Sequence, residues 1–544
     1  MTKLQMRSFS LPHIHSPKSI KRRSFGTDNI NASPAARLPA DVLVYIFMLL
    51  RDDYSSAEDE TSLSWITVTH VCRRWREIAL EVAGLWTAMF YGSPQSWGEL
   101  INRSCEAPAD VVLDIDKDAD VQAALPIMHH LHRFERFVMH GSEIFDVIPT
   151  LVDQAPLLQT LMLQFNNYEH PQDNPLKVDD NVLSSLFGGS LPRLRTLLLS
   201  RIPLRADCHL FVPTLTSLEL HGCEYENLSV RVPLAGLVEV LARLPLLEKL
   251  ALEDIFANPD TSDLLLESLA HIPVAQLPHL RTLSNMTPFP SINKAFMGHL
   301  HAPNLTDFSA QTKVNTASEV VIIPLISWTQ DPTSFIALYI HALPGYLGAT
   351  GGPACFSDDK GASADDDPPF SLSLESSEII LSDAVMELCA QLPLHLVRSF
   401  HFLYDDSFRW APLLRQMHDL EEIKAKLINW KDLLEALAVT VNDDSHDGPC
   451  CLLCPMLKKL KFITYGNRPE SEGSFFEALS TTVRLRRASG CGLEEILIDG
   501  GSVPCRSEED IADIREYCLA SQPSSESQPL LQCVIQKPGS AFFH

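Results

Sequence analysis

Residues 38–47 read LPADVLVYIF, and this stretch decides the start of the fold. Its proline is favoured in the first turn of a helix, because the missing N–H would have no partner there. The aspartate two residues later places a negative charge near the helix N-terminus, which the helix dipole stabilises. Val42, Ile46 and Leu49 recur at helical spacing. The stretch therefore predicts an amphipathic helix that begins at the LP pair.

A second helical pattern follows an acidic stretch at residues 52–60 and contains VCRRWR at residues 71–76. Its apolar positions recur on one helical face: Val68, Cys72, Trp75 and Ala79. A glycine and then LW at residues 85–86 end the segment, because glycine commonly stops a helix. Apolar residues on one helical face are also typical of a simple helical bundle, in which Trp75 and Trp86 would fill the bundle's own core.

The order and spacing of these segments resemble an F-box, the helical module that docks a substrate receptor onto the Skp-type adaptor of a cullin-RING ubiquitin ligase. The chain is similar to fungal-type F-box-like proteins, and the module would span residues 37–90. The acidic stretch between the helices is longer than in compact F-boxes. The resemblance implies adaptor-binding roles for nine residues: Leu38, Pro39, Val42, Ile46, Val71, Cys72, Trp75, Leu85 and Trp86.

One phrase recurs beyond this module: a proline, then leucines arranged as L-x-x-L-x-L. Its strongest copies begin at Pro156, Pro192, Pro213 and Pro245, and weaker ones follow at Pro278, Pro303 and Pro455. A short unit repeated at this scale cannot bury its own apolar face, so neighbouring units must stack. The phrase resembles a leucine-rich repeat, although the copies are irregular and most lack the Asn or Cys that normally follows.

Helical patterns lie between the copies, for example at residues 234–244. The alternation of strand and helix predicts a parallel sheet. The expected fold is therefore α+β overall: a small helical F-box, then an irregular α/β leucine-rich-repeat solenoid over residues 91–544. An acidic insertion at residues 351–369 has the composition of a disordered segment. An ordinary α/β domain with leucine-rich strands is the alternative.

Composition narrows the classes of protein that the chain can belong to. It has 544 residues and a net charge of −26, which opposes sequence-independent binding of nucleic acid. No apolar run reaches the length of a membrane span. The first 36 residues carry six basic residues against one acidic residue and predict a disordered tail; a mitochondrial presequence and a nuclear signal remain open alternatives. Thirteen scattered cysteines favour a reducing compartment, so the cytoplasm, the nucleus or both.

Three motifs invite a chemical reading that their spacing does not support. Asp114, Asp116 and Asp118 alternate as in a calcium loop, but the glycine and glutamate that an EF-hand needs are absent from their positions. Cys451 and Cys454 form a single C-x-x-C with no second pair at zinc-site spacing. No nucleophile or phosphate-loop motif stands in a suitable context. We therefore predict no catalytic residue, metal or cofactor.

Three functions remain at this point. The F-box resemblance implies a substrate-recognition subunit that binds a Skp-type adaptor, reaches a cullin through it, and recruits an unknown protein target with the repeats. A non-degradative scaffold with the same fold is the second, and an unrecognised enzyme is the third. Because the chain is acidic, a target with a basic surface is favoured.

Overall fold

The computed structural model divides the chain into two compact units, which are described separately. Unit 1 comprises Met1–Ser327 with Leu372–Glu375, and unit 2 comprises Trp328–Ser371 with Ser376–His544. The residues whose structure is described are 38–55, 64–89, 94–166, 186–202, 207–222, 233–256, 274–314, 337–343, 346–352, 370–375, 381–404, 408–426, 430–438, 440–441, 451–463, 472–498 and 501–504. The predicted tail at 1–36, most of the acidic stretch at 52–60 and the insertion beyond residue 352 lie outside them.

Unit 1 begins with a small helical region. Its elements are α1 (Ala40–Ser55), the 3-10 helix η2 (Ser64–His70), α2 (Arg73–Glu81) and the 3-10 helix η3 (Ala83–Trp86). The prediction of one continuous helix from Val68 to Ala79 is wrong. Cys72 has an extended backbone (φ −157°, ψ 169°), so the chain turns there and Val68 and Trp75 belong to different helices.

A mostly parallel sheet follows in unit 1. Each strand pairs in parallel with the next one in the order β1 (Ala88–Met89), β2 (Ala109–Asp114), β3 (Phe134–Gly141), β4 (Thr160–Phe165), β5 (Thr196–Ser200), β6 (Ser217–His221), β7 (Lys249–Glu253), β9 (Thr282–Thr287) and β11 (Asp307–Lys313). A separate parallel pair joins β8 (Ala275–Gln276) to β10 (Leu300–His301).

The leucines of the recurring phrase form the core beneath this sheet. Leu161, Leu197, Leu218, Leu250 and Leu283 are successive register partners on neighbouring strands, and all are fully buried. Because side chains alternate between the faces of a strand, the intervening residues point to the other face. Removing a leucine from water contributes about 2 kcal/mol, so the row accounts for much of the driving force that stacks the strands.

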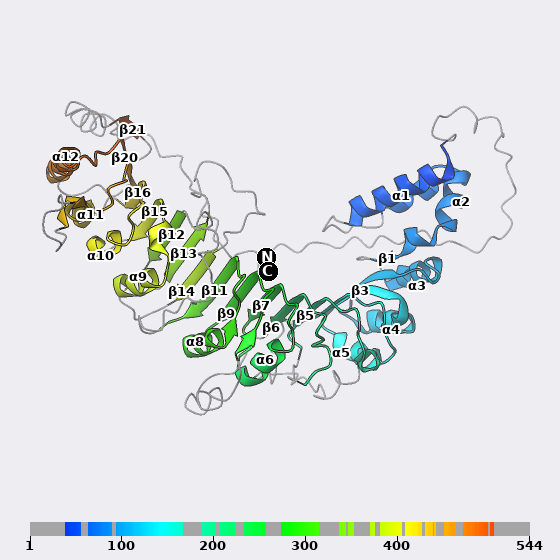
Figure 1. Cartoon of the computed structure of the whole chain (residues 1–544). Coiled ribbons are helices and arrows are strands. Elements are labelled where there is room, and N and C mark those ends of the chain that lie inside the picture. Colours follow the sequence, from blue (N-terminus) through cyan, green and yellow to red (C-terminus); the bar gives the residue numbers. More distant parts are fainter. Residues whose placement is uncertain are drawn as a thin grey trace, which may run out of the picture. The chain divides into compact units, whose positions relative to one another are not determined.

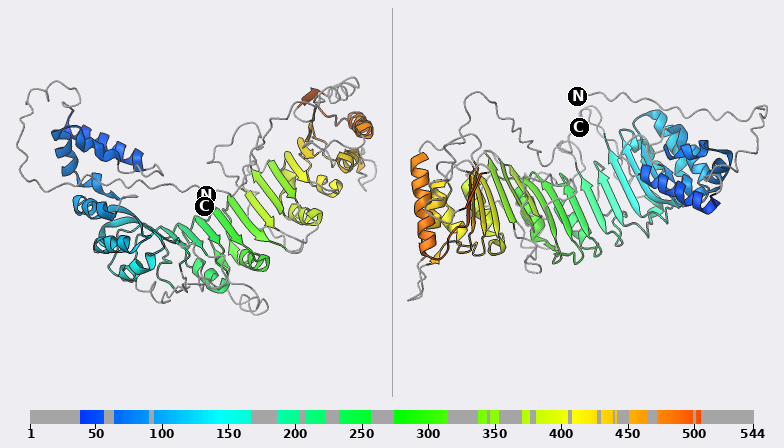
Figure 2. Two further views of the ribbon diagram at one scale, coloured as in Figure 1. Left: turned by 180° about the vertical axis from the view of Figure 1, so that it is seen from behind. Right: turned by 90° about the horizontal axis from the view of Figure 1, so that it is seen from above.

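Helices cover only one face of the unit 1 sheet (Figure 1, Figure 2). They are α3 (Pro94–Arg103), α4 (Asp118–Met128), α5 (Ile144–Val147), α6 (Leu234–Leu241) and α8 (Pro290–Gly298). Short 3-10 turns accompany them: η4 (Leu131–Arg133), η5 (Ile148–Thr150) and η7 (Leu186–Gly189). The described residues place no helix on the other face, which we call the open face of unit 1.

Unit 2 has the same layered organisation. In it β12 (Ala337–Leu343), β15 (Ser399–Tyr404), β16 (Glu422–Lys426), β19 (Lys459–Ile463) and β20 (Glu495–Ile498) pair in parallel in that order. Antiparallel partners β13 (Tyr346–Gly352) and β21 (Gly501–Pro504) flank β12 and β20, and β17 (Thr440–Val441) pairs with β18 (Cys451–Leu452). The residues of strand β14 (Phe370–Glu375) are divided between the units, with Leu372–Glu375 assigned to unit 1.

The helices of unit 2 again cover one face of its strands (Figure 2). They are α9 (Leu381–Ala390), the 3-10 turn η9 (Leu394–Leu396), α10 (Trp410–Leu414), α11 (Trp430–Ala438) and α12 (Glu472–Ala488). The predicted combination of an N-terminal helical region with a large, mostly parallel sheet is therefore present. No helix in the described part of the chain has both the length and the apolar character needed to cross a membrane.

Candidate adaptor-binding surface

Helix α1 has one buried face and one exposed apolar face. Leu43 and Phe47, four residues apart, are fully buried and face the helical region's core. Val42, Tyr45 and Leu49 lie on another face and keep 39%, 65% and 52% of their surface exposed. The carbonyl of Pro39 accepts the N–H of Leu43 at 3.1 Å, so the proline begins the helix as predicted.

Exposed apolar side chains are concentrated in this region. Of the eleven large apolar residues that are exposed in the described part of the chain, five lie within the helical region: Val42, Tyr45, Leu49, Val71 and Leu80. Water-exposed apolar surface that gathers on one module is typical of a protein-binding site. Tyr45 is a member that the sequence analysis missed. It lies three residues after Val42 and four before Leu49, so helical spacing places it on the same face as these two residues.

A hydrogen bond brings the LP segment to the start of α2. The Arg74 guanidinium donates to the carbonyl of Leu38 at 2.7 Å. Pro39 is exposed beside this bond, and Val71 (60% exposed) and Cys72 are exposed just before α2. Two segments that are more than thirty residues apart in sequence therefore supply neighbouring exposed side chains.

The remaining predicted contact residues differ in how deeply they are buried. Ile46 and Trp75 are half-buried, and the rings of Trp75 and Phe47 pack with centroids 5.2 Å apart. Leu85 and Trp86 keep 0% and 1% of their surface, so neither offers a partner any surface here. The indole N–H of Trp86 donates to the carbonyl of Ala79 at 2.8 Å, which explains the burial. Direct adaptor contact by Leu85 and Trp86 stays a prediction, because both side chains are buried in the unbound chain.

The C-terminal end of the helical region contacts the rest of unit 1. The guanidinium carbon of Arg103 in α3 lies 4.4 Å above the ring of Trp86, at cation–π distance. Strand β1 begins two residues after Trp86 and pairs with β2. Two contacts, one from a helix and one from a strand, thus join the module to the sheet within unit 1.

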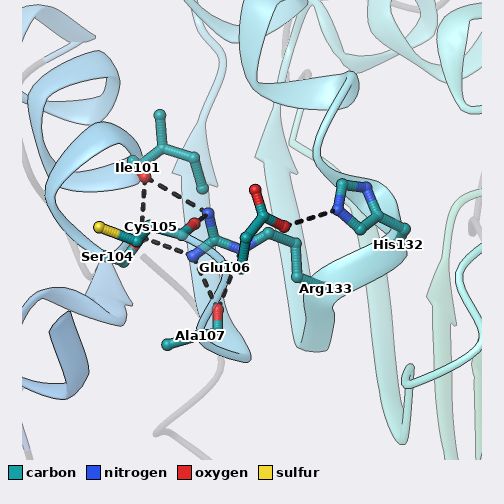
Figure 3. Close-up of polar contacts among 7 residues, drawn as sticks. All are labelled: Ile101, Ser104, Cys105, Glu106, Ala107, His132 and Arg133. Atoms are coloured by element: carbon teal, nitrogen blue, oxygen red, sulfur yellow. Dashed lines mark hydrogen bonds and ion pairs between the residues drawn. The ribbon is translucent and has the colours of Figure 1, made fainter.

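A buried arginine holds the far end of α3 (Figure 3). Arg133 keeps 2% of its surface exposed, and its guanidinium donates to Ser104 Oγ at 2.6 Å and to the carbonyl of Ala107 at 2.7 Å. It also donates to the carbonyls of Ile101 and Cys105 in the last turn of α3 and just beyond. Carbonyls at the end of a helix need donors from outside the helix, and the Ile101 carbonyl also accepts the Ser104 hydroxyl at 2.9 Å. Burial lowers the pKa of Arg133 from its ordinary value.

The rejected chemical motifs have other roles in the structure. Asp114 lies 3.3 Å from His140 Nδ1, and Asp116 accepts the backbone N–H of Ser142 at 3.1 Å. Burial raises the pKa of the Cys454 thiol to about 12, which disfavours the thiolate that zinc requires. In the described residues no three His, Cys, Asp or Glu side chains gather as they do around a metal ion. His446 and Cys450, near the C-x-x-C, lie outside those residues.

Comparison with known proteins adds one positive finding. No curated protein matches the chain. Residues 35–91 match the family model described as F-box-like. That match covers α1, η2, α2 and η3, the helical region that contains the exposed apolar side chains. The chain therefore carries an F-box-like domain at residues 35–91.

Proposed function

We propose that this chain is the substrate-recognition subunit of a Skp-cullin-F-box ubiquitin ligase. The observation that carries the proposal is the exposed apolar surface formed by Pro39, Val42, Tyr45, Leu49 and Val71 on the F-box-like domain. F-box domains generally bind Skp-type adaptors. Burial of exposed aliphatic and aromatic side chains at a surface of this kind supplies most of the affinity of such a contact.

We further propose that the remaining strands and helices form an irregular leucine-rich-repeat solenoid that recruits a protein target. The recurring L-x-x-L-x-L phrase and the in-register rows of buried leucines support it. The chain itself would perform no catalysis. Its bound target would be held near the activated ubiquitin that other subunits of the ligase supply, so that proximity raises the rate of transfer. Such a complex would work in the cytoplasm, the nucleus or both.

A pull-down of the full-length chain with purified Skp-type adaptor tests the proposal. The variant V42D/V71D places charges on the exposed apolar surface without entering the core, because both valines are exposed. We expect it to lose adaptor binding while its circular dichroism spectrum is unchanged. Val152, a valine that is 52% exposed outside the F-box-like domain, provides the matched control V152D, which should bind as the unmodified chain does. Binding by V42D/V71D at the unmodified level would overturn the proposal.

The scaffold alternative predicts the same adaptor binding and a different fate for the partner. A protein captured by the full-length chain in cells should increase in abundance when the proteasome is inhibited if it is recruited for degradation. A captured partner whose abundance does not respond would favour the scaffold.

A further inference from the structure

The three arginines of the VCRRWR segment make different contacts. Arg73 has a side chain that is 85% exposed, and it pairs with Glu77 on the same helix at 2.7 Å. Arg74 is half-buried and Arg76 is exposed, but both reach from α2 to a backbone carbonyl of another segment. Two of the three therefore hold parts of the helical region together and do not simply form a solvated basic helix face.

Arg74 binds the peptide group that joins Leu38 to Pro39. Its Nη2 donates to the carbonyl of Leu38 at 2.7 Å, across 36 positions of the sequence. An amide that leads into a proline has no N–H, so the carbonyl is the one hydrogen-bonding group that this amide offers. A hydrogen bond from a charged donor is roughly twice as strong as one between neutral groups. The guanidinium thus fixes the orientation of this peptide plane relative to α2.

The same peptide group leads directly into α1 and into the proposed adaptor surface. The carbonyl of Pro39 accepts the N–H of Leu43 at 3.1 Å, and Pro39 is itself exposed. On the other side of the hydrogen bond, α2 follows directly after the exposed residues Val71 and Cys72. The orientation of the Leu38 carbonyl therefore decides where the Pro39 ring lies relative to Val71.

A second guanidinium holds the segment that precedes α2. The Nε of Arg76 donates to the carbonyl of Thr69 at 2.8 Å. Thr69 is buried in η2, and Val71 follows it by two residues with 60% of its surface exposed. Each of the two non-helical segments that contribute to the proposed surface is therefore joined to α2 by an arginine.

We propose that Arg74 is a positioning residue for adaptor binding: it holds the Leu38–Pro39 segment in its bound orientation before the adaptor arrives. This role rests on the proposed function. A partner that meets an ordered segment loses less conformational freedom on binding, so the same apolar contacts give a higher affinity. Arginine suits the task because its planar donor group is pre-organised, and less side-chain entropy is lost for each hydrogen bond than with lysine.

The test measures the adaptor affinity of the full-length chain by isothermal titration calorimetry. Arg74→Gln should raise Kd about five-fold, because the segment must then be ordered during binding. Arg74→Lys keeps a charged donor and should give an intermediate Kd. Arg73→Gln is the matched control for charge: it removes the same charge from the neighbouring exposed site and should leave Kd within about two-fold. If Arg74→Gln fails to fold, the comparison of Arg74→Lys with Arg73→Lys provides the same readout.

Arg51→Gln is the control for a general loss of stability. Arg51 also donates to a distant carbonyl within the helical region, that of Gly84 at 2.5 Å. Gly84 precedes Leu85, which is buried, so this bond holds no exposed residue of the proposed surface. Arg51→Gln should lower the melting temperature as Arg74→Gln does, but leave Kd within about two-fold. Equal weakening of adaptor binding by both variants would overturn the positioning role, because it would show a general effect of stability.

Hydrogen exchange of the free chain distinguishes positioning from direct contact. With no adaptor present, Arg74→Gln should speed exchange of the Leu43 N–H, whose acceptor is the Pro39 carbonyl. A weaker affinity with unchanged exchange would overturn the proposal, because Arg74 would then act by contacting the adaptor itself. An unchanged Kd would overturn it too, while adaptor binding by the unmodified chain would still support the proposed function. If the unmodified chain binds no adaptor, the proposed function fails first, and the role of Arg74 is overturned with it.

Discussion

The ring of Trp75 lies against the ring of Phe47, with centroids 5.2 Å apart and planes tilted by 58°. Phe47 is fully buried on α1, whereas Trp75 on α2 is half-buried. One face of the indole thus joins the two helices, and the remainder lies at the surface that we assign to the adaptor. Trp75 therefore has a structural role, and in the proposed function it also contacts the adaptor.

Replacing Trp75 should show how much its ring contact contributes to stability. We expect Trp75→Ala to lower the free energy of unfolding by about 2 kcal/mol, because the aromatic contact and its buried area are lost. Trp75→Phe keeps a ring against Phe47 and should lose less than about 1 kcal/mol. Urea denaturation of both variants measures the difference. Equal stability of the two variants would show that the ring contact contributes little.

Thiol reactivity provides a test of the adaptor surface without any substitution. Cys72 and Cys105 are both exposed, but only Cys72 lies on the proposed surface. Cys389 and Cys454 are buried, and burial raises the pKa of each thiol to about 12, so both should resist iodoacetamide in the folded chain. Bound adaptor should slow alkylation of Cys72 and leave Cys105 unchanged, as followed by mass spectrometry. Equal protection of both cysteines would contradict the assigned surface.

Trp86→Phe should weaken the fold of the F-box-like domain and spare its surface. The substitution removes the hydrogen bond to the carbonyl of Ala79 and weakens the cation–π contact with Arg103, for an expected loss of about 1–2 kcal/mol. Adaptor affinity of the folded protein should change by less than about two-fold, because Trp86 is buried. A large loss of affinity at unchanged stability would support the predicted direct contact between Trp86 and the adaptor.

Arg133→Met should destabilise unit 1 strongly. The change removes the guanidinium donor from the carbonyls of Cys105 and Ala107, while the carbonyl of Ile101 keeps the Ser104 hydroxyl, and we expect a loss of about 3 kcal/mol. Arg136→Met, on the open face three residues later, should cost less than about 1 kcal/mol. Denaturant midpoints compare the two, and similar losses would show that the guanidinium network is not the cause.

A histidine–glutamate pair predicts one component of acid sensitivity. His221 Nδ1 lies 2.9 Å from Glu253 Oε2, and the hydrogen bond holds the pKa of Glu253 below its ordinary value of 4.5. A carboxyl with a lowered pKa in the folded state contributes stability above its ordinary pKa, and loses it as the pH falls through the lowered value. Glu253→Gln should therefore melt below the unmodified chain at neutral pH, and the gap should narrow as the pH falls below the ordinary pKa of 4.5. A constant gap would rule out the linkage.

The sequence was sufficient to predict which side chains are buried where an apolar pattern repeats. Leucines at alternate positions of β4 to β7 are buried as their phrase predicts, because strand periodicity assigns each of them to one face. It was insufficient where tertiary contacts override periodicity. Nothing local in VCRRWR marks the helix break at Cys72, and nothing in LW distinguishes a buried support from an exposed contact. Arg133 gave no signal either, since an arginine before a strand is ordinarily a surface residue.

The first strand of the unit 1 sheet has a consequence for self-association. β1 contains only Ala88 and Met89 and follows directly from the F-box-like domain. A long, bare outer strand would offer a row of unpaired backbone groups, on which a second chain can add a strand and begin to aggregate. With two residues there is almost no template for such growth. The F-box-like domain, which we assign to adaptor binding, therefore lies next to a sheet edge that offers little backbone for pairing. We expect that removing this domain makes the remaining chain prone to fibre-like assembly.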